Sequence, residues 1–398
     1  MKKVILGIDS WYPQVDGVTN AVVNYRKNLP EPFSADIVAP SYGKKCDEEG
    51  EERYCEGVFH NRSLAVPFIG FRNSVPASDR KLKKMLSDQK PAILHAHSPF
   101  AICKFFAKYG KKHGIPVVYT FHTKYKDEFY RVTHSRLIAF VMTRIILSNI
   151  RRADYVWAVS ENAAQTLSSY GYRGKISVVR NGTDMKVASS AELAALSAQV
   201  NTEYDLAPGT RVLLFVGRVV SVKNLAFSFR VFAELKRRGA TNYKFFVVGG
   251  GEELEQHKKL ARKLGMADDV IFTGFVGDRE IIRRYYARAD LFLLPSVFDN
   301  APLVVLEAAA CHTPALVPRG SSAAEVITDG ETGFAETLDE KLWADKIETC
   351  FSEKYYAVRE QCARVLCSWK DAVAGAAQEY ERVLSDCQAR RQKNKEKQ

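Results

Sequence analysis

Short apolar runs alternate with longer amphipathic stretches along almost the whole chain, and this alternation occurs twice. Strands are predicted at Val4–Ile8, Ala35–Val38, Ile93–His95, Val117–Phe121, Tyr155–Val159, Ile176–Val179, Val212–Val216, Phe245–Val248, Val270–Phe272, Leu291–Leu294 and Ala315–Val317. Helices are predicted between them, among others at Arg80–Gln89, Phe227–Arg238, Leu254–Leu264 and Glu280–Arg288. Alternating strands and helices, with strands apolar throughout, predict parallel sheets covered on both faces. We therefore predict an α/β fold of two doubly wound, Rossmann-like domains that face each other across a cleft.

The boundary between the two domains is predicted where a polar stretch rich in Ala and Ser follows the last apolar run of the first half. The first domain is expected to span residues 1–185 and the second residues 186–371. A C-terminal helix at about 372–390 is expected to pack back on the first domain. Residues 388–398 have few apolar side chains and are expected to form a basic, solvated tail.

The composition is typical of a globular protein. Of 398 residues, 46% are hydrophobic and 26% are charged, which excludes intrinsic disorder for most of the chain. The eight cysteines contain no Cys-x-x-Cys pair, which excludes zinc-ribbon and thioredoxin-type sites. The best candidate for a membrane span, Leu137–Ile150, is interrupted by Arg144. We expect a cytoplasmic protein that does not cross a membrane.

Positive charge is concentrated in the first half of the chain. The formal net charge is +12, of which residues 1–200 carry +11 and residues 201–398 carry +1. Such asymmetry indicates an anionic partner for the first half. Because this half contains no helix-turn-helix, zinc-finger or aromatic RNA-binding motif, we do not expect the partner to be a nucleic acid.

Two carboxylates follow the predicted strand Leu291–Leu294. A helix is predicted to begin near Pro302, and its N-terminus offers unpaired N–H groups to a phosphate. Asp299 lies just before this helix, and Glu307 lies about one and a half turns inside it, where a carboxylate needs a partner. Two interpretations remain open. Either these residues form a ligand site, or Asp299 caps the helix and Glu307 pairs with a structural arginine.

Two cations follow the predicted strand Val212–Val216. Arginine binds diphosphate oxygens in a bidentate way and lysine supplies a compact charge, so Arg218 and Lys223 are candidates for an anion site. The alternative is a pair of solvated surface cations. Gly17 and Gly250 lie in loops after other predicted strands. Neither loop is a dinucleotide fingerprint or a Walker A motif, so plain turns remain an equal alternative.

Three histidines, His95, His97 and His122, end two predicted strands of the first domain. A metal site would use all three, but we expect one of His95 and His97 to point away, which favours polar residues that line a cleft. No Asp-x-Asp pair is present to hold a divalent cation on a diphosphate. We therefore predict that the protein binds no metal.

The segment Ile102–Lys112 is predicted to form a basic helix. One face is expected to carry Lys104, Lys108, Lys111 and Lys112. Aromatic residues occupy adjoining positions, and a basic helix with aromatic edges can lie on an anionic membrane. The alternative is an ordinary amphipathic helix whose aromatic side chains pack on the sheet.

Taken together, these segments resemble the retaining glycosyltransferases of family 4, which have the GT-B fold. Four segments carry the resemblance: Asp299-x7-Glu307, Gly217-Arg218 with Lys223-Asn224-Leu225, Val178 to Asp184, and Glu325-Val326-Ile327 with Gly333-Phe334. The resemblance extends from Val4 to about Tyr380. Tyr119–Tyr125 and the Gly17 loop are most similar to glycolipid-forming members, such as diacylglycerol glucosyltransferases.

The resemblance implies a nucleotide-sugar donor held mainly by the second domain. Arg218 and Lys223 would bind its diphosphate, Asp299 the transferred sugar and Glu307 the ribose, while His122 would line the sugar pocket. Further donor contacts would come from Gly17, Gly250, Asn300, Ala301, Pro302 and Leu303. Asp299 departs from the family pattern, because the family has the longer Glu at this position.

The resemblance further implies a retaining hexosyltransferase that needs no metal and no cofactor besides the nucleotide-sugar co-substrate. The expected reaction moves a hexose from UDP-glucose or a similar donor to a lipid such as diacylglycerol. The acceptor would lie in an anionic membrane surface, with the protein peripheral on the inner face of the cell membrane. Open alternatives are a soluble or polysaccharide acceptor and GDP-mannose as donor. A nucleotide-sugar epimerase is disfavoured by the spacings of the charged residues.

Overall fold

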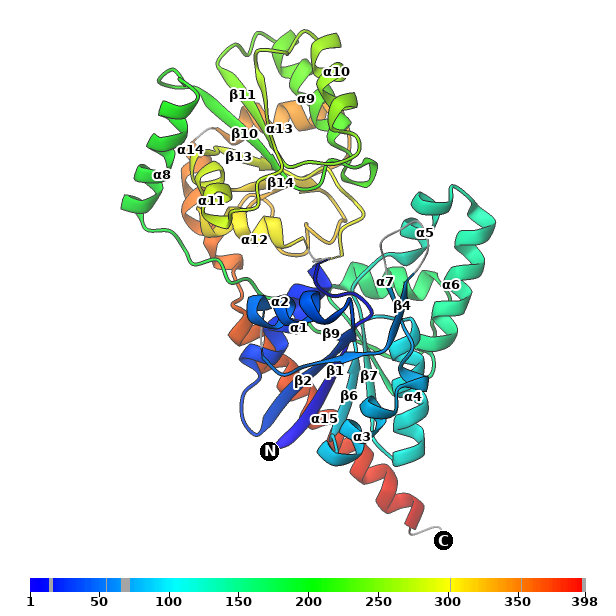
Figure 1. Ribbon diagram of the computed structural model, residues 1–398. Coiled ribbons are helices and arrows are strands. Elements are labelled where there is room, and N and C mark those ends of the chain that lie inside the picture. Colours follow the sequence, from blue (N-terminus) through cyan, green and yellow to red (C-terminus); the bar gives the residue numbers. More distant parts are fainter. Residues whose placement is uncertain (14–16, 55, 66–71, 301, 352, 396–398) are drawn as a thin grey trace. The chain divides into compact units, whose positions relative to one another are not determined.

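The computed structural model describes residues 1–13, 17–54, 56–65, 72–300, 302–351 and 353–395, which divide into two compact units (Figure 1). Unit 1 comprises residues 1–182 and 367–398, and unit 2 comprises residues 183–366. The chain thus leaves unit 1 close to the predicted residue 185 and returns to it close to the predicted residue 371.

Unit 1 is built on a seven-stranded parallel sheet with the strand order β3-β2-β1-β6-β7-β8-β9. Its strands are β1 (Lys2–Gly7), β2 (Phe33–Pro40), β3 (Val58–Asn61), β6 (Ile93–Ala96), β7 (Val117–Phe121), β8 (Tyr155–Ala158) and β9 (Ile176–Val178). Every residue of β6 and β7 is buried, as expected for strands covered on both faces. A separate antiparallel pair joins β4 (Ser63–Ala65) and β5 (Arg72–Ser74).

The helices of unit 1 are α1 (Gly17–Asn28), α2 (Lys44–Tyr54), α3 (Arg80–Gln89), α4 (Ala101–His113), α5 (Tyr125–Thr133), α6 (Arg136–Ile150), α7 (Glu161–Ser169) and the C-terminal α15 (Trp369–Lys395), with a 3-10 turn at Pro76–Ser78. The predicted return of a C-terminal helix agrees with the position of α15, whose Val373, Ala376 and Tyr380 share one core with residues of β1 and α1. The last turns of this helix extend beyond the sheet (Figure 1).

Unit 2 holds a six-stranded parallel sheet with the order β12-β11-β10-β13-β14-β15. Its strands are β10 (Arg211–Val216), β11 (Tyr243–Val248), β12 (Val270–Gly274), β13 (Leu291–Leu293), β14 (Ala315–Pro318) and β15 (Phe334–Glu336). Side chains alternate along β10, so that Leu213 and Phe215 join the core under α9 while Leu214 and Val216 join the core under α11.

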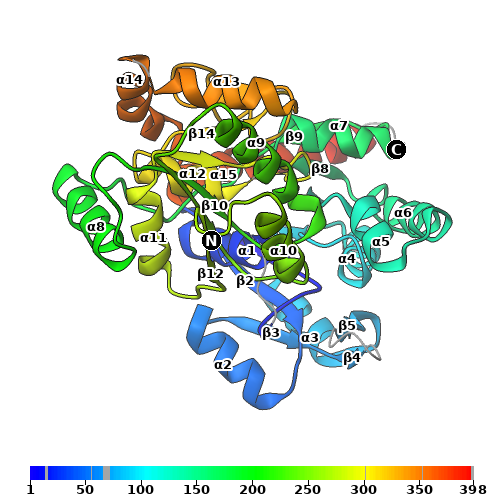
Figure 2. The same cartoon turned by 90° about the horizontal axis from the view of Figure 1, so that it is seen from above.

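The helices of unit 2 are α8 (Ser190–Glu203), α9 (Leu225–Arg237), α10 (Leu254–Lys263), α11 (Arg279–Arg288), α12 (Leu303–Ala310), α13 (Glu340–Cys350) and α14 (Glu353–Gln361), with 3-10 turns at Ser221–Lys223 and Cys362–Val365. Figure 2 shows α8 beside α11 at one edge of this unit. The predicted α/β fold with parallel sheets is confirmed, and each predicted strand corresponds to a strand of one of the two sheets.

Both sheets reverse their strand order once, between β1 and β6 in unit 1 and between β10 and β13 in unit 2. At such a switch point the loops after the two strands diverge, and ligands of open α/β sheets bind there. The predicted residues Arg218 and Lys223 follow β10, and Asp299 follows β13. The topology therefore brings these two loops together at the carboxyl ends of the two neighbouring central strands.

Candidate active site

The loops after β10 and β13 are joined by hydrogen bonds. The first loop bends at Gly217, whose φ of 151° favours glycine. Further along, Asn224 Nδ2 donates to the carbonyl of Pro295 at 3.3 Å, and Ser296 Oγ donates to the carbonyl of Val222 at 3.1 Å. These bonds hold the backbone around Lys223 against the backbone that leads to Asp299.

The pair formed by Lys223 and Asp299 is the centre of this arrangement. Lys223 Nζ lies 2.5 Å from Asp299 Oδ1, and both side chains are about four-fifths buried, with exposed fractions of 18% and 20%. The second carboxylate oxygen, Oδ2, is buried and accepts no hydrogen bond from the described residues. Because an unsatisfied buried oxygen is costly, a ligand that donates a hydroxyl hydrogen to it would be stabilised.

Arg218 differs from Lys223. Its side chain is exposed and forms no ion pair with the described part of the chain. The interpretation as a solvated cation therefore describes Arg218 in this structure, whereas Lys223 is held by a carboxylate. Lys223 is preorganised and Arg218 has the freedom to move toward an anion.

Glu307 is held by two groups that the sequence did not reveal. Its Oε1 lies 3.3 Å from Nη2 of Arg279, and its Oε2 accepts a hydrogen bond from the hydroxyl of Tyr286 at 3.2 Å. Burial and the nearby Glu307 raise the pKa of Tyr286 well above its usual range, so that this hydroxyl stays protonated and donates. Pairing of Glu307 with an arginine, one of the two predicted interpretations, is thus observed.

The start of α12 corrects the other half of that interpretation. Pro302 precedes the helix and offers no side-chain cap, and among the described residues Oδ1 of Asp299 accepts from Lys223 while Oδ2 accepts from no N–H of α12, so Asp299 is not a helix cap. The first residue of the helix, Leu303, is half-buried, and both Pro302 and Asn300 are buried. Ala301, also predicted to contact the donor, lies outside the described residues.

Three consecutive glycines follow β11 and pack against the loop that carries Arg218. A Cβ at Gly249 would lie 1.9 Å from the carbonyl oxygen of Gly217, and a Cβ at Gly251 would lie 2.2 Å from that of Val219. At Gly250, the predicted donor contact, the nearest atom would be Cβ of Phe275 at 3.3 Å. The outer two glycines are therefore required by packing, whereas the middle one is less crowded.

The three histidines of unit 1 lie together, which corrects the expectation that His95 or His97 points away. The ring centroids of His95 and His97 are 4.0 Å apart, and His97 Nδ1 lies 2.9 Å from His122 Nε2. Residues two positions apart on a strand share a face, and His97 directly follows the end of β6. Burial lowers the pKa of His122 to about 3 and lowers those of His95 and His97, so all three are neutral at pH 7.

Among the described residues, the side chains of His, Cys, Asp and Glu form no group of three or more able to hold a metal ion. None of the described helices has the length and apolar character that a membrane crossing needs. Gly17 begins α1 and is exposed, and a Cβ there would meet no atom within 4 Å.

The basic helix is α4. It exposes Lys104, Lys108, Lys111 and Lys112. Phe105 and Phe106 are buried, and the ring of Phe106 lies against Gly7 of β1. Of the two alternatives for this segment, burial of the aromatic side chains is therefore the one observed at Phe105 and Phe106.

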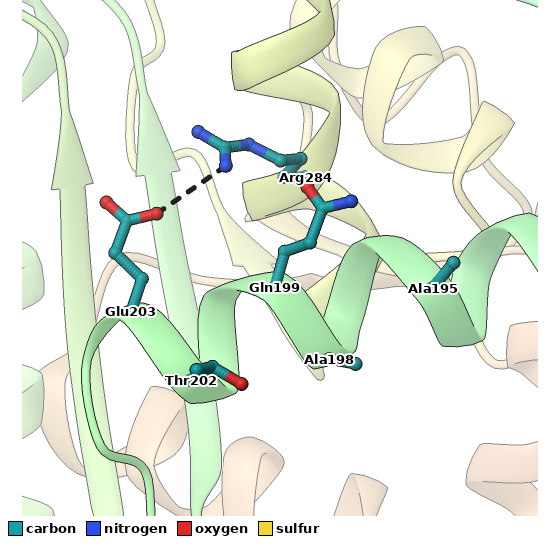
Figure 3. Close-up of a pocket in the computed structure, with 6 residues that line it drawn as sticks. All are labelled: Ala195, Ala198, Gln199, Thr202, Glu203 and Arg284. Carbon is teal, nitrogen blue, oxygen red and sulfur yellow. Dashed lines mark ion pairs between the residues drawn. The ribbon is translucent and has the colours of Figure 1, made fainter.

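A pocket between α8 and α11 is lined by Ala195, Ala198, Gln199, Thr202, Glu203 and Arg284 (Figure 3). The small alanine side chains leave this hollow, and Arg284 pairs with Glu203 across it at 3.6 Å. None of the predicted site residues lines the pocket, so it is not part of the candidate site.

Comparisons with known proteins relate both halves of the chain to glycosyltransferases. Residues 15–187 match the model of Glycosyltransferase Family 4, and residues 201–364 match the model of Glycosyl transferases group 1. The chain is 25% identical over 371 residues to the alpha-monoglucosyldiacylglycerol synthase of Streptococcus pneumoniae, which covers 89% of this chain and 82% of the relative. It is 34% identical over 194 residues to a D-inositol 3-phosphate glycosyltransferase of Nocardiopsis dassonvillei, which covers 46% and 44%.

A solved structure, Anabaena HepE in complex with UDP, superposes with a TM-score of 0.75 at 18% identity and covers 97% of this chain and 100% of that one. A sucrose-phosphate synthase from Thermosynechococcus elongatus superposes with a TM-score of 0.73 at 17% identity, with coverage of 97% and 100%. These two likenesses concern the fold. With both halves matched by family models in order, the chain belongs to the family 4 glycosyltransferases and has the GT-B fold.

Proposed function

We propose that the chain transfers a hexose from UDP-glucose or a similar nucleotide sugar to a lipid acceptor such as diacylglycerol, with retention and without a divalent metal. The observation that carries the proposal is the pair of Lys223 and Asp299 at the switch point of unit 2. A fixed cation and a buried, unsatisfied carboxylate oxygen there suit a ligand with a phosphate at one end and hydroxyl groups at the other.

Negative charge develops on the diphosphate as its bond to the sugar breaks. Lys223 is already in place to stabilise that charge, and the exposed Arg218 follows the same strand. The N-terminus of α12, where Pro302 offers no side-chain cap, would add N–H groups and the positive end of the helix dipole. Removal of one such preorganised donor typically costs about 2.7–4 kcal/mol in the transition state.

The two carboxylates take different parts of the donor. Oδ2 of Asp299 would accept a hydrogen bond from a hydroxyl of the transferred sugar. Glu307, which is positioned by Tyr286 and Arg279, would accept hydrogen bonds from the hydroxyls of the ribose. The bond between the sugar and the diphosphate breaks, the acceptor oxygen bonds to the same face of the sugar, and the proton of the acceptor hydroxyl passes to the departing phosphate oxygen. This route needs no protein nucleophile.

The lipid acceptor is proposed from the relative in S. pneumoniae, named for its product on diacylglycerol, and from the positive charge of the first half of the chain. The test offers UDP-glucose, UDP-galactose and GDP-mannose with three acceptors: diacylglycerol in vesicles, inositol phosphate and an oligosaccharide. Products are identified by mass spectrometry, and their anomeric configuration by NMR.

We expect α-glucosyl diacylglycerol from UDP-glucose, formed equally well in EDTA. Transfer only to a soluble acceptor would overturn the lipid assignment. Conversion of the donor without any acceptor would point instead to an epimerase, and a β-linked product would exclude retention.

A further inference from the structure

The hairpin of α5 and α6 exposes large apolar side chains that the fold of unit 1 leaves uncovered. They are Tyr130, Val132, Leu137, Ile138, Phe140, Val141 and Ile145. Within the described residues these are seven of the sixteen large hydrophobic side chains that are exposed. Soluble monomers rarely expose contiguous apolar patches, so such a concentration on one helical hairpin indicates a surface that is covered in use.

The outer face of α6 is mostly apolar: among its exposed residues, Leu137, Ile138, Phe140, Val141 and Ile145 are apolar, whereas Arg136, Arg144 and Ser148 are polar. Ala139, Ile146 and Leu147 are buried and hold the helix on unit 1. On the opposite side, Leu137 and Ile145 are exposed to 72% and 58%. A surface helix of a globular protein normally places polar residues on that side, so packing within unit 1 does not account for the composition of α6.

The charge of the residues around the hairpin indicates which kind of partner it binds. Helix α6 contains no acidic residue, and residues 125–152 hold six basic residues against two acidic ones, Asp127 and Glu128. Glu128 pairs with Arg131 at 3.1 Å, while Arg136 and Arg144 are exposed. An apolar face bordered by cations matches the interface of an anionic lipid bilayer.

The neighbouring helix adds to this charge. Helices α4, α5 and α6 lie side by side at one edge of unit 1 (Figures 1 and 2), and Cys103 of α4 lies beside Asn149 of α6, with 3.8 Å between its sulfur and the carbonyl oxygen. The four exposed lysines of α4 are therefore carried by the helix adjacent to the apolar hairpin. Cations near an anionic surface are attracted to it, so these lysines would strengthen binding to anionic headgroups.

We propose that the α5–α6 hairpin inserts its exposed apolar side chains into an anionic lipid bilayer, with the lysines of α4 beside it on the headgroups. The inference deepens the proposed function, because α5 begins three residues after His122, which the family resemblance places in the sugar pocket. A hairpin seated in the bilayer at that position would bring the end of β7 close to a lipid acceptor.

The test uses the full chain and vesicles of phosphatidylglycerol or phosphatidylcholine. One variant replaces Leu137, Val141 and Ile145 by Gln, and a matched control replaces the exposed Leu64, Leu338 and Leu342 by Gln. We expect the wild type and the control to co-sediment with phosphatidylglycerol. The hairpin variant should bind at least about tenfold more weakly, because three apolar side chains no longer leave water.

Insertion can be detected by the fluorescence of a tryptophan introduced into the hairpin. The four native tryptophans are buried, so a change in emission on adding vesicles would report on the introduced residue. We expect Phe140→Trp to show a blue shift in emission with phosphatidylglycerol vesicles and Leu342→Trp to show none. Equal vesicle binding by the hairpin variant and the wild type would overturn the inference. A wild-type dimer in the ultracentrifuge that the hairpin variant converts to a monomer, with no vesicle binding, would show instead that a second copy covers this face.

Failure of the inference can be told apart from failure of the proposed function. Glucosyl transfer to diacylglycerol in detergent by a protein that binds no vesicle would overturn the inference alone. Vesicle binding through the hairpin without any sugar transfer would overturn the proposed function and support the inference.

Discussion

Asp299 and Glu307 are both carboxylates of the candidate site, but they are held in different ways. Asp299 has one oxygen on Lys223 and one buried oxygen without a described donor. Both oxygens of Glu307 are already engaged, by Arg279 and Tyr286. The free oxygen of Asp299 suits a group whose position changes during the reaction, whereas the fixed Glu307 suits a group that is bound equally before and during it.

Substitution of the two carboxylates should therefore separate turnover from binding. We expect Asp299→Asn to lower kcat by about 10²–10³-fold with little change in KM, and Glu307→Gln to raise KM for the donor about tenfold with kcat nearly unchanged. Steady-state kinetics with varied donor measures both. Asp269→Asn, at a carboxylate paired with Lys236 and Lys244 in the same unit, is the control. An equal effect on kcat and KM in both variants would contradict the assignment of roles.

The buried histidines predict how stability depends on pH. Their pKa values are lowered by burial, so the unfolded chain binds protons that the folded chain does not once the pH falls below about 6.5. The free energy of unfolding should then fall on acidification. Each histidine contributes up to about 1.4 kcal/mol per pH unit. Asp9, which lies two residues after β1, has the opposite effect on the free energy of unfolding. Burial raises the pKa of this carboxyl to about 7, so between its usual pKa and pH 7 the folded chain binds a proton that the unfolded chain does not.

Urea unfolding between pH 5 and pH 7 measures this dependence. We expect His97→Gln to reduce the slope of unfolding free energy against pH, and Asp9→Asn to make it steeper. An unaltered slope in the His97 variant would mean that folding does not lower the pKa of this imidazole.

At the scale of elements, the amphipathic pattern predicted most strands and helices but did not predict which faces are covered. The short strands β3 and β15 lie at the edges of the two sheets and were not predicted, because three or four residues carry too little periodicity. For α4 the sequence left open whether the aromatic residues are exposed or packed on the sheet, and the structure buries Phe105 and Phe106. The apolar residues of α6 were considered only as part of the candidate membrane span Leu137–Ile150, which Arg144 interrupts.

The glycine turn after β11 should respond differently at its three positions. Gly249 has a φ of 145° and no room for a Cβ beside the carbonyl of Gly217, so we expect Gly249→Ala to lower the free energy of unfolding by about 2–3 kcal/mol. Gly250→Ala needs only a small shift of Phe275 and should cost less than about 1 kcal/mol. Urea unfolding compares the two variants, and equal losses would contradict the packing described for this turn.

Helix α15 is held on unit 1 by apolar packing, by the ion pair of Glu381 with Lys2 at 2.7 Å, and by a buried hydrogen bond between the hydroxyl of Tyr380 and Nδ1 of His95 at 2.5 Å, among other contacts. Tyr380→Phe leaves that nitrogen without its partner, which should cost about 1–3 kcal/mol of unfolding free energy. Tyr356→Phe, at an exposed tyrosine of α14, should change it by less than about 0.5 kcal/mol. Matching losses in the two variants would show that the bond to His95 does not stabilise the fold.

At the scale of the whole molecule, two parallel sheets and the loops that carry Arg218, Lys223 and Asp299 were predictable, because strand order and chain order are closely linked in doubly wound folds. The partners of Glu307 were not. Arg279 and Tyr286 lie on α11 and reach α12 only through the fold, and their spacing in the chain follows no local pattern. Side-chain contacts between elements are therefore the part of the site that the sequence alone does not predict.

Under the proposed function, unit 2 binds the nucleotide sugar through the Lys223 site without a metal. Calorimetric titration of UDP-glucose in EDTA tests it, with Lys223→Met compared with Lys236→Met, a lysine that is also paired with a carboxylate in unit 2. We predict binding by the wild type and by the Lys236 variant, and a loss of about tenfold or more in the Lys223 variant. Wild-type binding that appears only when Mg²⁺ or Mn²⁺ is added would contradict binding without a metal. Equal affinity in both variants would contradict the role of Lys223.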